Sequence, residues 1–558
     1  MYFLFLTLTL AACGSSEDAD TQAPVEADTA VSLDTAVDSE PPNEDTGGVT
    51  DADGDGIEAD EDCDDADPER GGPEVPYDGV DNDCDAGTPD DDLDGDGYAL
   101  VEDCDDEDPT VGYGGAGSWE GDLTDWSFTE FCQACSERTV VGGDVRLTAG
   151  VDDVSELWCL VGVEPDPVVY DRGGNLVIER SSLSSLDGLH NLHAISGELT
   201  IQDNDALVNL RGLEGLTDVG GDLFVAYNNA LTHLDGVDGL VAIDGQVDVM
   251  HNGALIDLSG LDSLQYVGGG IRISNNGALA SLDGLQGLQT HADIFSLHNN
   301  PQLAELSGLS ALVEVETFSI SGCQALTSLD GLESLAVVSG VLNMTDMVSL
   351  TGLEGLVSLE QVGALQLWRN PVLTSLAGME RLTVLEWGLD IIDSDALVDL
   401  DGLNNVTSLG FDLYLEENDA LQSLSGLENL TQIDGNVYLT SNNVLADLDG
   451  LGGLTTVNGD LYIGRYDKPY KGTEYREGND SLISLGGLVS LRDIDGSLFI
   501  ESNRDLRDII ALGAVERVTG AVHVHENNNL TDADGEALCA AISEVGGVCL
   551  VSDNGGAH

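Results

Sequence analysis

The sequence predicts a mainly β protein whose long C-terminal region is a capped, right-handed solenoid of about 15 short-strand coils. From Gly173 onward the chain repeats about every 24 residues, a period typical of solenoids. Aliphatic residues alternate at positions 3 and 5 of each repeat, and leucines recur at positions 11, 14, 17 and 20. An asparagine occupies position 8 in most repeats.

Each repeat is expected to form one short strand and a return path. In GDLFVAYNNALTHLDGVDGLVAID, residues 221–244, Leu223 and Val225 fall on one side of the strand because strand side chains alternate. The leucine positions then line the inner wall of the return path, so each coil buries its apolar side against its neighbours. We count about fifteen coils between Gly173 and Asn529.

The asparagines are expected to form an architectural ladder and not a binding site. An amide that both donates and accepts can satisfy the turn after a strand and stack on the adjacent coil. Cys323 takes this position in one coil, which favours a buried free thiol. The asparagines are Asn204, Asn228, Asn252, Asn276, Asn300, Asn370, Asn418, Asn442, Asn479, Asn503 and Asn527.

The core pattern Leu-x-x-Leu-x-Gly-Leu-x-x-Leu, preceded by the strand and the asparagine, resembles the receptor L domain family and, more broadly, leucine-rich repeats. The resemblance covers some two thirds of the chain and implies a solenoid fold. A solenoid needs both open ends covered. Residues 113–172, with three tryptophans and three cysteines, are expected to form an N-terminal cap joined to one irregular coil.

The C-terminal cap is expected to be a short helix beginning near Glu536, stapled by a disulfide between Cys539 and Cys549. The pairing of the other cysteines stays open. Cys132 and Cys135 form a Cys-x-x-Cys motif, for which an oxidised structural cap is favoured over a redox centre. The predicted segments are 1–13 (signal), 14–50 (tether), 51–112 (metal-binding module), 113–172 (cap), 173–532 (solenoid) and 533–558 (disulfide cap and tail).

The charge of the chain disfavours polyanionic partners. Asp and Glu number 105 against 17 Lys and Arg, for a formal net charge of −88. Binding to nucleic acid or to anionic lipid head groups is therefore electrostatically unfavourable. Residues 14–50 hold ten acidic and no basic residues, and such a segment is expected to be a disordered tether.

The N-terminus MYFLFLTLTLAAC resembles the lipobox of bacterial lipoproteins. The resemblance implies that Cys13 becomes the acylated first residue of the mature chain and that the protein is lipid-anchored in a bacterial cell envelope, at the outer membrane or cell surface. A plain cleavable signal or a buried strand is the alternative. Export would also permit disulfides.

Two acidic loops repeat with a displacement of 41 residues: DADGDGIEADEDCDDADP at 51–68 and DLDGDGYALVEDCDDEDP at 92–109. Alternating aspartates, a glycine for the sharp turn, a backbone carbonyl and a carboxylate at the twelfth position are the ligand spacing of a calcium loop. The predicted ligands are Asp51, Asp53, Asp55, Ile57 and Asp62 in the first loop, and Asp92, Asp94, Asp96, Tyr98 and Asp103 in the second.

These loops differ from an EF-hand because the twelfth position is Asp and no amphipathic helices flank them. They resemble thrombospondin type-3 repeats and, with YDGVDNDCD at 77–85, the MopE-type metal-binding motif of exported bacterial proteins. The resemblance implies calcium as the ligand. A merely acidic spacer and a transition-metal site are the alternatives, and the oxygen-rich ligand set disfavours the second.

An aromatic row is predicted on the outward face of the last five coils. Position 4 faces outward, where earlier coils carry residues such as Thr200 or Arg272, with Phe224 an isolated exception. The insertion GRYDKPYKGTEYREG, residues 464–478, interrupts the coil after Tyr462 and is expected to overhang the row. The row comprises Tyr414, Tyr438, Tyr462, Phe499 and His523. The predicted ligand-binding residues are Tyr414, Tyr438, Tyr462 and Phe499 of the row, with Arg465, Lys468, Tyr470, Lys471, Tyr475 and Arg476 from the insertion.

Catalysis is disfavoured because no acid and base pair stands apart from the repeat. His523 and His525 point outward from the last predicted strand, but without a third ligand they are expected to be plain surface. The best hypothesis is a non-enzymatic, calcium-binding surface lipoprotein that recognises a glycan or a protein. A structural envelope component without a ligand and a polysaccharide-active enzyme are the alternatives.

Calcium is expected to order residues 51–110, because clustered carboxylates repel one another until a cation neutralises them. A calcium titration of this fragment should change its circular dichroism spectrum, with a dissociation constant of about 10⁻⁴ to 10⁻³ M. An unchanged spectrum would contradict the calcium hypothesis and favour the acidic spacer.

Overall fold

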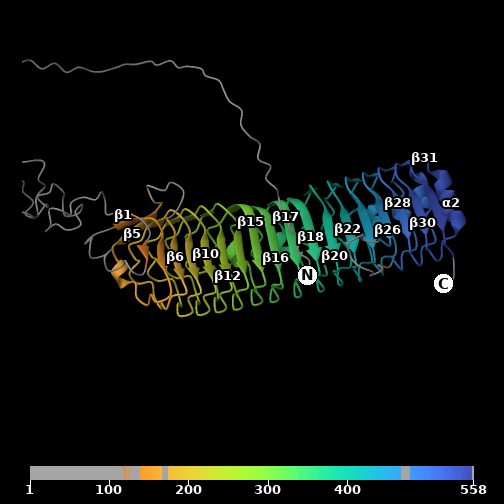
Figure 1. Cartoon of the computed structure of the whole chain (residues 1–558). Coiled ribbons are helices and arrows are strands. Elements are labelled where there is room, and N and C mark those ends of the chain that lie inside the picture. The colour runs from red at the N-terminus through yellow and green to blue at the C-terminus, as the bar shows by residue number, and fades with distance from the viewer. Residues whose placement is uncertain (1–117, 121–122, 125–138, 166–173, 467–477, 556–558) are drawn as a thin grey trace, which may run out of the picture. The chain divides into compact units, whose positions relative to one another are not determined.

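The computed structural model describes residues 118–120, 123–124, 139–165, 174–466 and 478–555. The chain divides into two units, 1–71 and 72–558, and all of the described residues belong to the second. They form a solenoid of stacked parallel coils (Figure 1), so the predicted mainly β solenoid is confirmed. In the part of the chain that is described, no helix has the length and apolarity needed to cross a bilayer.

One long ladder of parallel strands runs along the solenoid, with each strand paired to the equivalent strand of the next coil. Its strands are β2 (Leu123–Thr124), β4 (Val145–Leu147), β6 (Leu176–Glu179), β8 (Leu199–Gln202), β10 (Leu223–Ala226), β12 (Val247–Met250), β14 (Ile271–Ser274), β15 (Thr290–His298), β16 (Glu314–Ser321), β17 (Val337–Thr345), β18 (Gln361–Trp368), β20 (Leu389–Ile392), β22 (Leu413–Glu416), β24 (Val437–Thr440), β26 (Leu461–Gly464), β28 (Leu498–Glu501), β30 (Val522–His525) and β32 (Cys549–Ser552).

A second set of short strands precedes these in each coil. It comprises β1 (Ser118–Glu120), β3 (Thr139–Gly142), β5 (Leu160–Glu164), β7 (Ala194–Ile195), β9 (Asp218–Val219), β11 (Ala242–Ile243), β13 (Tyr266–Val267), β19 (Val384–Leu385), β21 (Ser408–Leu409), β23 (Gln432–Ile433), β25 (Thr456–Val457), β27 (Asp493–Ile494), β29 (Arg517–Val518) and β31 (Glu544–Val545). In the coils of β15 to β18 one long strand takes the place of the two separate strands.

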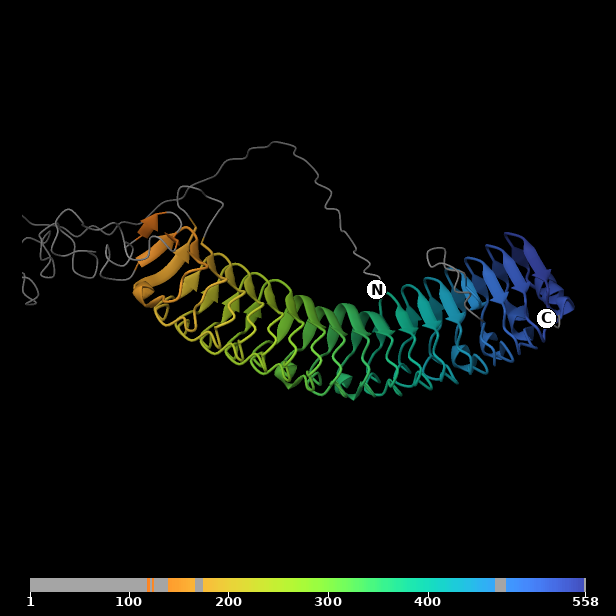
Figure 2. The ribbon, with the colours of Figure 1, turned by 60° about the horizontal axis from the view of Figure 1, so that its bottom comes forward.

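The number of coils agrees with the sequence. From β6 to β30 the long ladder contains fifteen strands, and β2, β4 and β32 extend it at the two ends. Figure 2 shows the coils following a gentle arc, with the long ladder on its inner side. Six single 3₁₀ turns occur among the described residues: η1 (Ser155–Leu157), η2 (Ser307–Leu309), η3 (Glu354–Leu356), η4 (Asp449–Leu451), η5 (Gly486–Leu488) and η6 (Ile510–Ala514).

The core is one continuous column of aliphatic side chains. Leu223 and Val225 of β10 point inward and meet the buried leucines of the return path, Leu231 and Leu234. The coils pack so closely at the Leu-x-Gly turn that a side chain on Gly212, at φ +113°, would overlap the carbonyl oxygen of the adjacent coil. Glycine is therefore required at this turn.

The asparagine ladder is confirmed as a hydrogen-bond device between coils. Asn228 is fully buried, and its Nδ2 donates to the carbonyl oxygen of Ile201 at 2.9 Å. Its Oδ1 accepts from the backbone N–H of Asn204 at 3.0 Å. The preceding residue, Tyr227, has φ 58°, so the chain turns through the left-handed region just after the strand. The amide thus satisfies backbone groups that this turn leaves buried.

Cys323 occupies the ladder as a buried thiol without a disulfide, as predicted. Burial raises the pKa of this thiol to about 11, which keeps it protonated and unreactive at neutral pH.

The C-terminal end contains the helix α2 (Asp532–Ala541) and the disulfide between Cys539 and Cys549, whose Cα atoms are 6.2 Å apart. The helix begins earlier than the predicted position near Glu536. The reason is a capping box, in which the side chains of Thr531 and Asp534 each accept the other's backbone N–H.

Replacing Asn228 with alanine should lower the free energy of unfolding by about 1–3 kcal/mol, because a buried carbonyl and a buried N–H lose their partners. The neighbouring Asn229 is a matched control, since its amide is exposed and bonds only the Asp205 carboxylate at 2.8 Å. Asn229→Ala should change stability by less than about 0.5 kcal/mol. Equal losses in chemical denaturation would contradict the structural role of the ladder.

Candidate functional site

Four aromatic side chains line up on the outward face of the C-terminal coils. Strand pairing places Tyr414, Tyr438, Tyr462 and Phe499 in one register across β22, β24, β26 and β28. The ring centroids of successive members are 4.2, 5.0 and 4.4 Å apart, and the rings are parallel to within 7°. We call these four residues the aromatic row.

The rings of the aromatic row stack on one another, so their faces are largely covered. Neighbouring strands are about 4.8 Å apart, which brings rings in register to stacking distance. Tyr438, inside the row, is only 6% exposed. The stacked rings of the row therefore stabilise the sheet by holding adjacent strands together.

The first residues of the insertion lie against the row. Gly464, at φ +106°, turns the chain out of β26, and the backbone N–H of Arg465 donates to the Glu501 carbonyl oxygen at 3.0 Å. The ring of Tyr466 lies 4.7 Å from the rings of both Tyr438 and Tyr462, tilted by 53° and 58°.

The hydroxyl groups of the row remain protonated donors. Burial, the largest cause, raises the pKa of Tyr414 to about 12 and raises the pKa of Tyr438 and Tyr462 further. Tyr462 donates its hydroxyl to the Asp460 carboxylate at 3.1 Å, and that negative charge also opposes phenolate formation.

A line of polar side chains continues the row toward the N-terminus. Ser319, Asn343, Gln366 and Asp390 occupy the same outward position of β16, β17, β18 and β20. Ser319 donates to Asn343 at 3.4 Å, Asn343 to Gln366 at 3.2 Å, and Gln366 to Asp390 at 3.1 Å. We call this set the polar lane. The prediction stopped at the aromatic residues, although the same repeat position identifies the other four.

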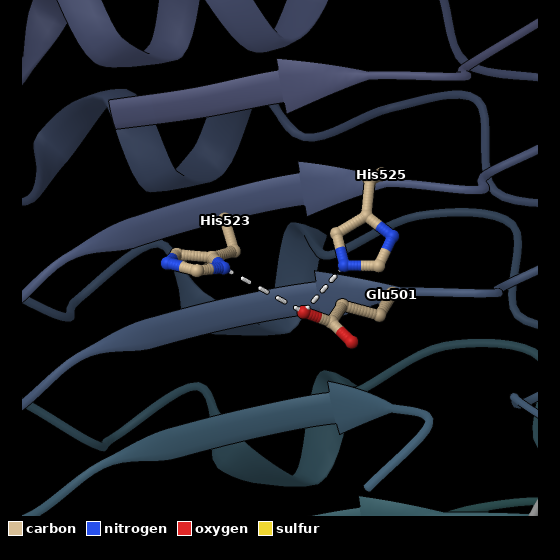
Figure 3. Close-up of side chains that lie close together, drawn as sticks. All are labelled: Glu501, His523 and His525. Carbon is tan, nitrogen blue, oxygen red and sulfur yellow. Dashed lines mark ion pairs between the residues drawn. The ribbon is translucent and has the colours of Figure 1, made fainter. Parts of the chain in front are cut away.

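Beyond Phe499 the row ends in a cluster of two histidines and a glutamate. The His523 ring lies 4.9 Å from the Phe499 ring, tilted by 54°. Glu501 Oε1 is 2.8 Å from His525 Nε2 and 3.9 Å from His523 Nδ1, as Figure 3 shows. The expectation that no third potential ligand accompanies the histidines is therefore wrong. Glu501 precedes His525 by one repeat, and that spacing could have revealed it.

The histidines also do not lie on the last strand, because β32 follows and pairs with β30. Within the cluster, burial raises the pKa of Glu501 above its ordinary value, while the charges of His525, His523 and Arg465 act in the opposite direction. Arg465 also forms an ion pair with Glu526 at 3.5 Å.

Several predicted site residues lie outside the described residues. They are Cys13, the calcium-loop residues Asp51, Asp53, Asp55, Ile57, Asp62, Asp92, Asp94, Asp96, Tyr98 and Asp103, and the insertion residues Lys468, Tyr470, Lys471, Tyr475 and Arg476. Their roles stay predictions.

Comparison with known proteins yields likenesses of fold. No family model matches the chain, and no curated protein matches it. An internalin from Listeria monocytogenes aligns at 14% identity over 56% of this chain and 87% of its own, with a TM-score of 0.27. A leucine-rich-repeat protein from Leptospira interrogans aligns at 14% identity over 75% of this chain and 99% of its own, with a TM-score of 0.26. At these values the likenesses say nothing about function.

Stability should fall at alkaline pH in a way that depends on Tyr414. Because the folded pKa is raised from 10.0 to about 12, the folded chain holds this proton where the unfolded chain loses it. The contribution of the protonated Tyr414 hydroxyl to the free energy of unfolding is complete below pH 10.0 and is lost as pH rises to about 12. Tyr414→Phe should therefore show a shallower decline than the wild type in urea unfolding across this range. Parallel declines would contradict the assignment.

Proposed function

We propose that this chain is a non-enzymatic binding protein that uses the outward face of the long ladder from β16 to β30. One observation carries the proposal: the polar lane and the aromatic row form a single line of side chains across consecutive coils. Their hydrogen bonds and ring contacts hold these side chains in place, which lowers the entropic cost of recognition. The alternative is a structural envelope component with no ligand.

A protein is the favoured partner. Sugar recognition by aromatic residues uses open ring faces, whereas stacking covers most of the faces in the aromatic row. Ring edges, tyrosine hydroxyls and the neighbouring Arg465 suit the packing and hydrogen bonding of a protein interface, where Tyr and Arg are enriched. The acidity of the chain favours a partner with a basic or neutral surface around this site.

A glycan is the second candidate, and the polar lane is the observation that favours it. Amide and carboxylate groups such as those of Asn343, Gln366 and Asp390 are hydrogen-bonding partners for sugar hydroxyls. A glycan chain lying along the polar lane would bring its end to Tyr414.

We also propose that the solenoid is held at the cell envelope by a lipid anchor and a calcium-binding segment. The lipobox around Cys13 supports a lipid anchor in a bacterial envelope, and the acidic tether would hold the rest of the chain away from the membrane. The spacing of the aspartates in residues 51–109 supports calcium-dependent stiffening of the segment before the solenoid.

Binding can be tested on arrays of envelope proteins and glycans with the full chain in calcium. The variants are a deletion of residues 465–477, and Tyr466→Ala for the case in which the deletion disturbs folding. The matched control is Tyr227→Ala, which removes another outward stacked ring, 4.6 Å from that of His251 and far along the solenoid.

Loss of a specific signal in both insertion variants, with Tyr227→Ala unchanged, would support the proposed face. A ligand bound equally well by every variant would place recognition elsewhere, and the absence of any ligand would favour the structural alternative. If the bound ligand is a glycan, Asn343→Ala should weaken it, which separates the two candidate partners.

A further inference from the structure

Three metal-binding side chains converge from two adjacent strands at the C-terminal end of the aromatic row. Glu501 in β28 pairs directly with His525 in β30, and His523 lies two residues earlier on the same face. Their potential ligand atoms all lie within 4.8 Å of one another, and no other such group occurs among the described residues. Figure 3 shows one nitrogen of each imidazole ring facing the same carboxylate oxygen of Glu501.

The distances fit a divalent transition-metal ion. Four-coordinate zinc with ligands at about 2.1 Å places neighbouring ligand atoms about 3.4 Å apart. The carboxylate oxygen Oε1 of Glu501 lies 2.8 Å from His525 Nε2 and 3.9 Å from His523 Nδ1. The first distance is shorter and the second longer than the separation expected around zinc. Small side-chain rotations would therefore suffice to enclose an ion.

We infer that Glu501, His523 and His525 form a binding site for one zinc-class divalent ion. Two imidazoles and one carboxylate are a common ligand set for zinc and related ions. The site leaves at least one coordination position for water or for a group from a partner. This inference does not depend on the proposed recognition function.

The surroundings favour a cation at this point. The three side chains are partly buried, with 15% of Glu501, 26% of His523 and 28% of His525 exposed, so water weakens the ligand interactions less than on an open surface. The nearby cation Arg465 has its charge partly balanced by Glu526 at 3.5 Å. The net charge of −88 also raises the local concentration of cations.

The site differs in selectivity from the predicted calcium loops. Calcium and magnesium prefer oxygen ligands, whereas imidazole selects zinc, copper, nickel and related ions. Excess calcium should therefore occupy oxygen-rich sites and leave the histidine cluster available. A bound ion would join the coil of β28 to the coil of β30 and so stiffen the end of the row.

The test is zinc binding by the full chain in excess calcium, measured by competition with a chromophoric chelator. We expect one high-affinity zinc ion per chain. His525→Ala and Glu501→Gln should each weaken its affinity at least tenfold. The matched control is His233→Gln, because His233 Nδ1 also lies 3.0 Å from a carboxylate one repeat away, that of Asp257, but has no third ligand. Its zinc affinity should stay within twofold of the wild type.

Cobalt substitution provides a second measurement that a structural ion pair would not affect. Bound Co²⁺ should give visible absorption typical of imidazole coordination, and this absorption should disappear in His523→Ala. Zinc binding that is absent in the wild type, or unchanged in the Glu501 and His525 variants, would overturn the inference. An equal loss in His233→Gln would also overturn it, because the effect would then not be specific to the cluster.

Discussion

The structure depends on one repeated constraint, the satisfaction of backbone groups where each strand turns into its return path. The strand ends in a left-handed residue, and the next residue buries its side chain between coils. An asparagine amide can donate to a backbone carbonyl of the adjacent coil and accept a backbone N–H of that same coil, as Asn252 does with Val225 and Asn228. These two hydrogen bonds fix the register between adjacent coils, because leaving either buried polar group unpaired would cost stability.

A fixed register has a direct consequence for the surface. Residues 23 or 24 positions apart become neighbours across adjacent strands, so residues at one outward position of successive coils form a row. The polar lane, the aromatic row and the contact between Glu501 and His525 all follow from this rule. The insertion is the exception, because it lengthens one coil. The asparagine ladder nevertheless continues, since the backbone N–H of Asn442 donates to the side chain of Asn479.

The same row that suggests recognition also stabilises the sheet. Parallel rings cover apolar surface that would otherwise face water, and Tyr466 adds a tilted ring over the middle of the stack. The faces of the rings hold the coils together. The proposed recognition of a partner would therefore use the exposed edges of the row, and the inferred metal ion would use the adjoining histidine cluster.

Residue spacing was sufficient to predict the solenoid, its coil number, the asparagine ladder, the buried thiol of Cys323 and the disulfide between Cys539 and Cys549. These features are periodic or local in sequence, so spacing is enough to predict them. Only the tertiary structure revealed that the stacked rings cover one another and that Glu501 lies beside the two histidines. Both depend on distances between side chains of different coils. The repeat pattern predicts which residues are neighbours, but not how far apart their side chains lie. The helix start at Asp532 likewise depended on a cap that forms only when Thr531 and Asp534 meet.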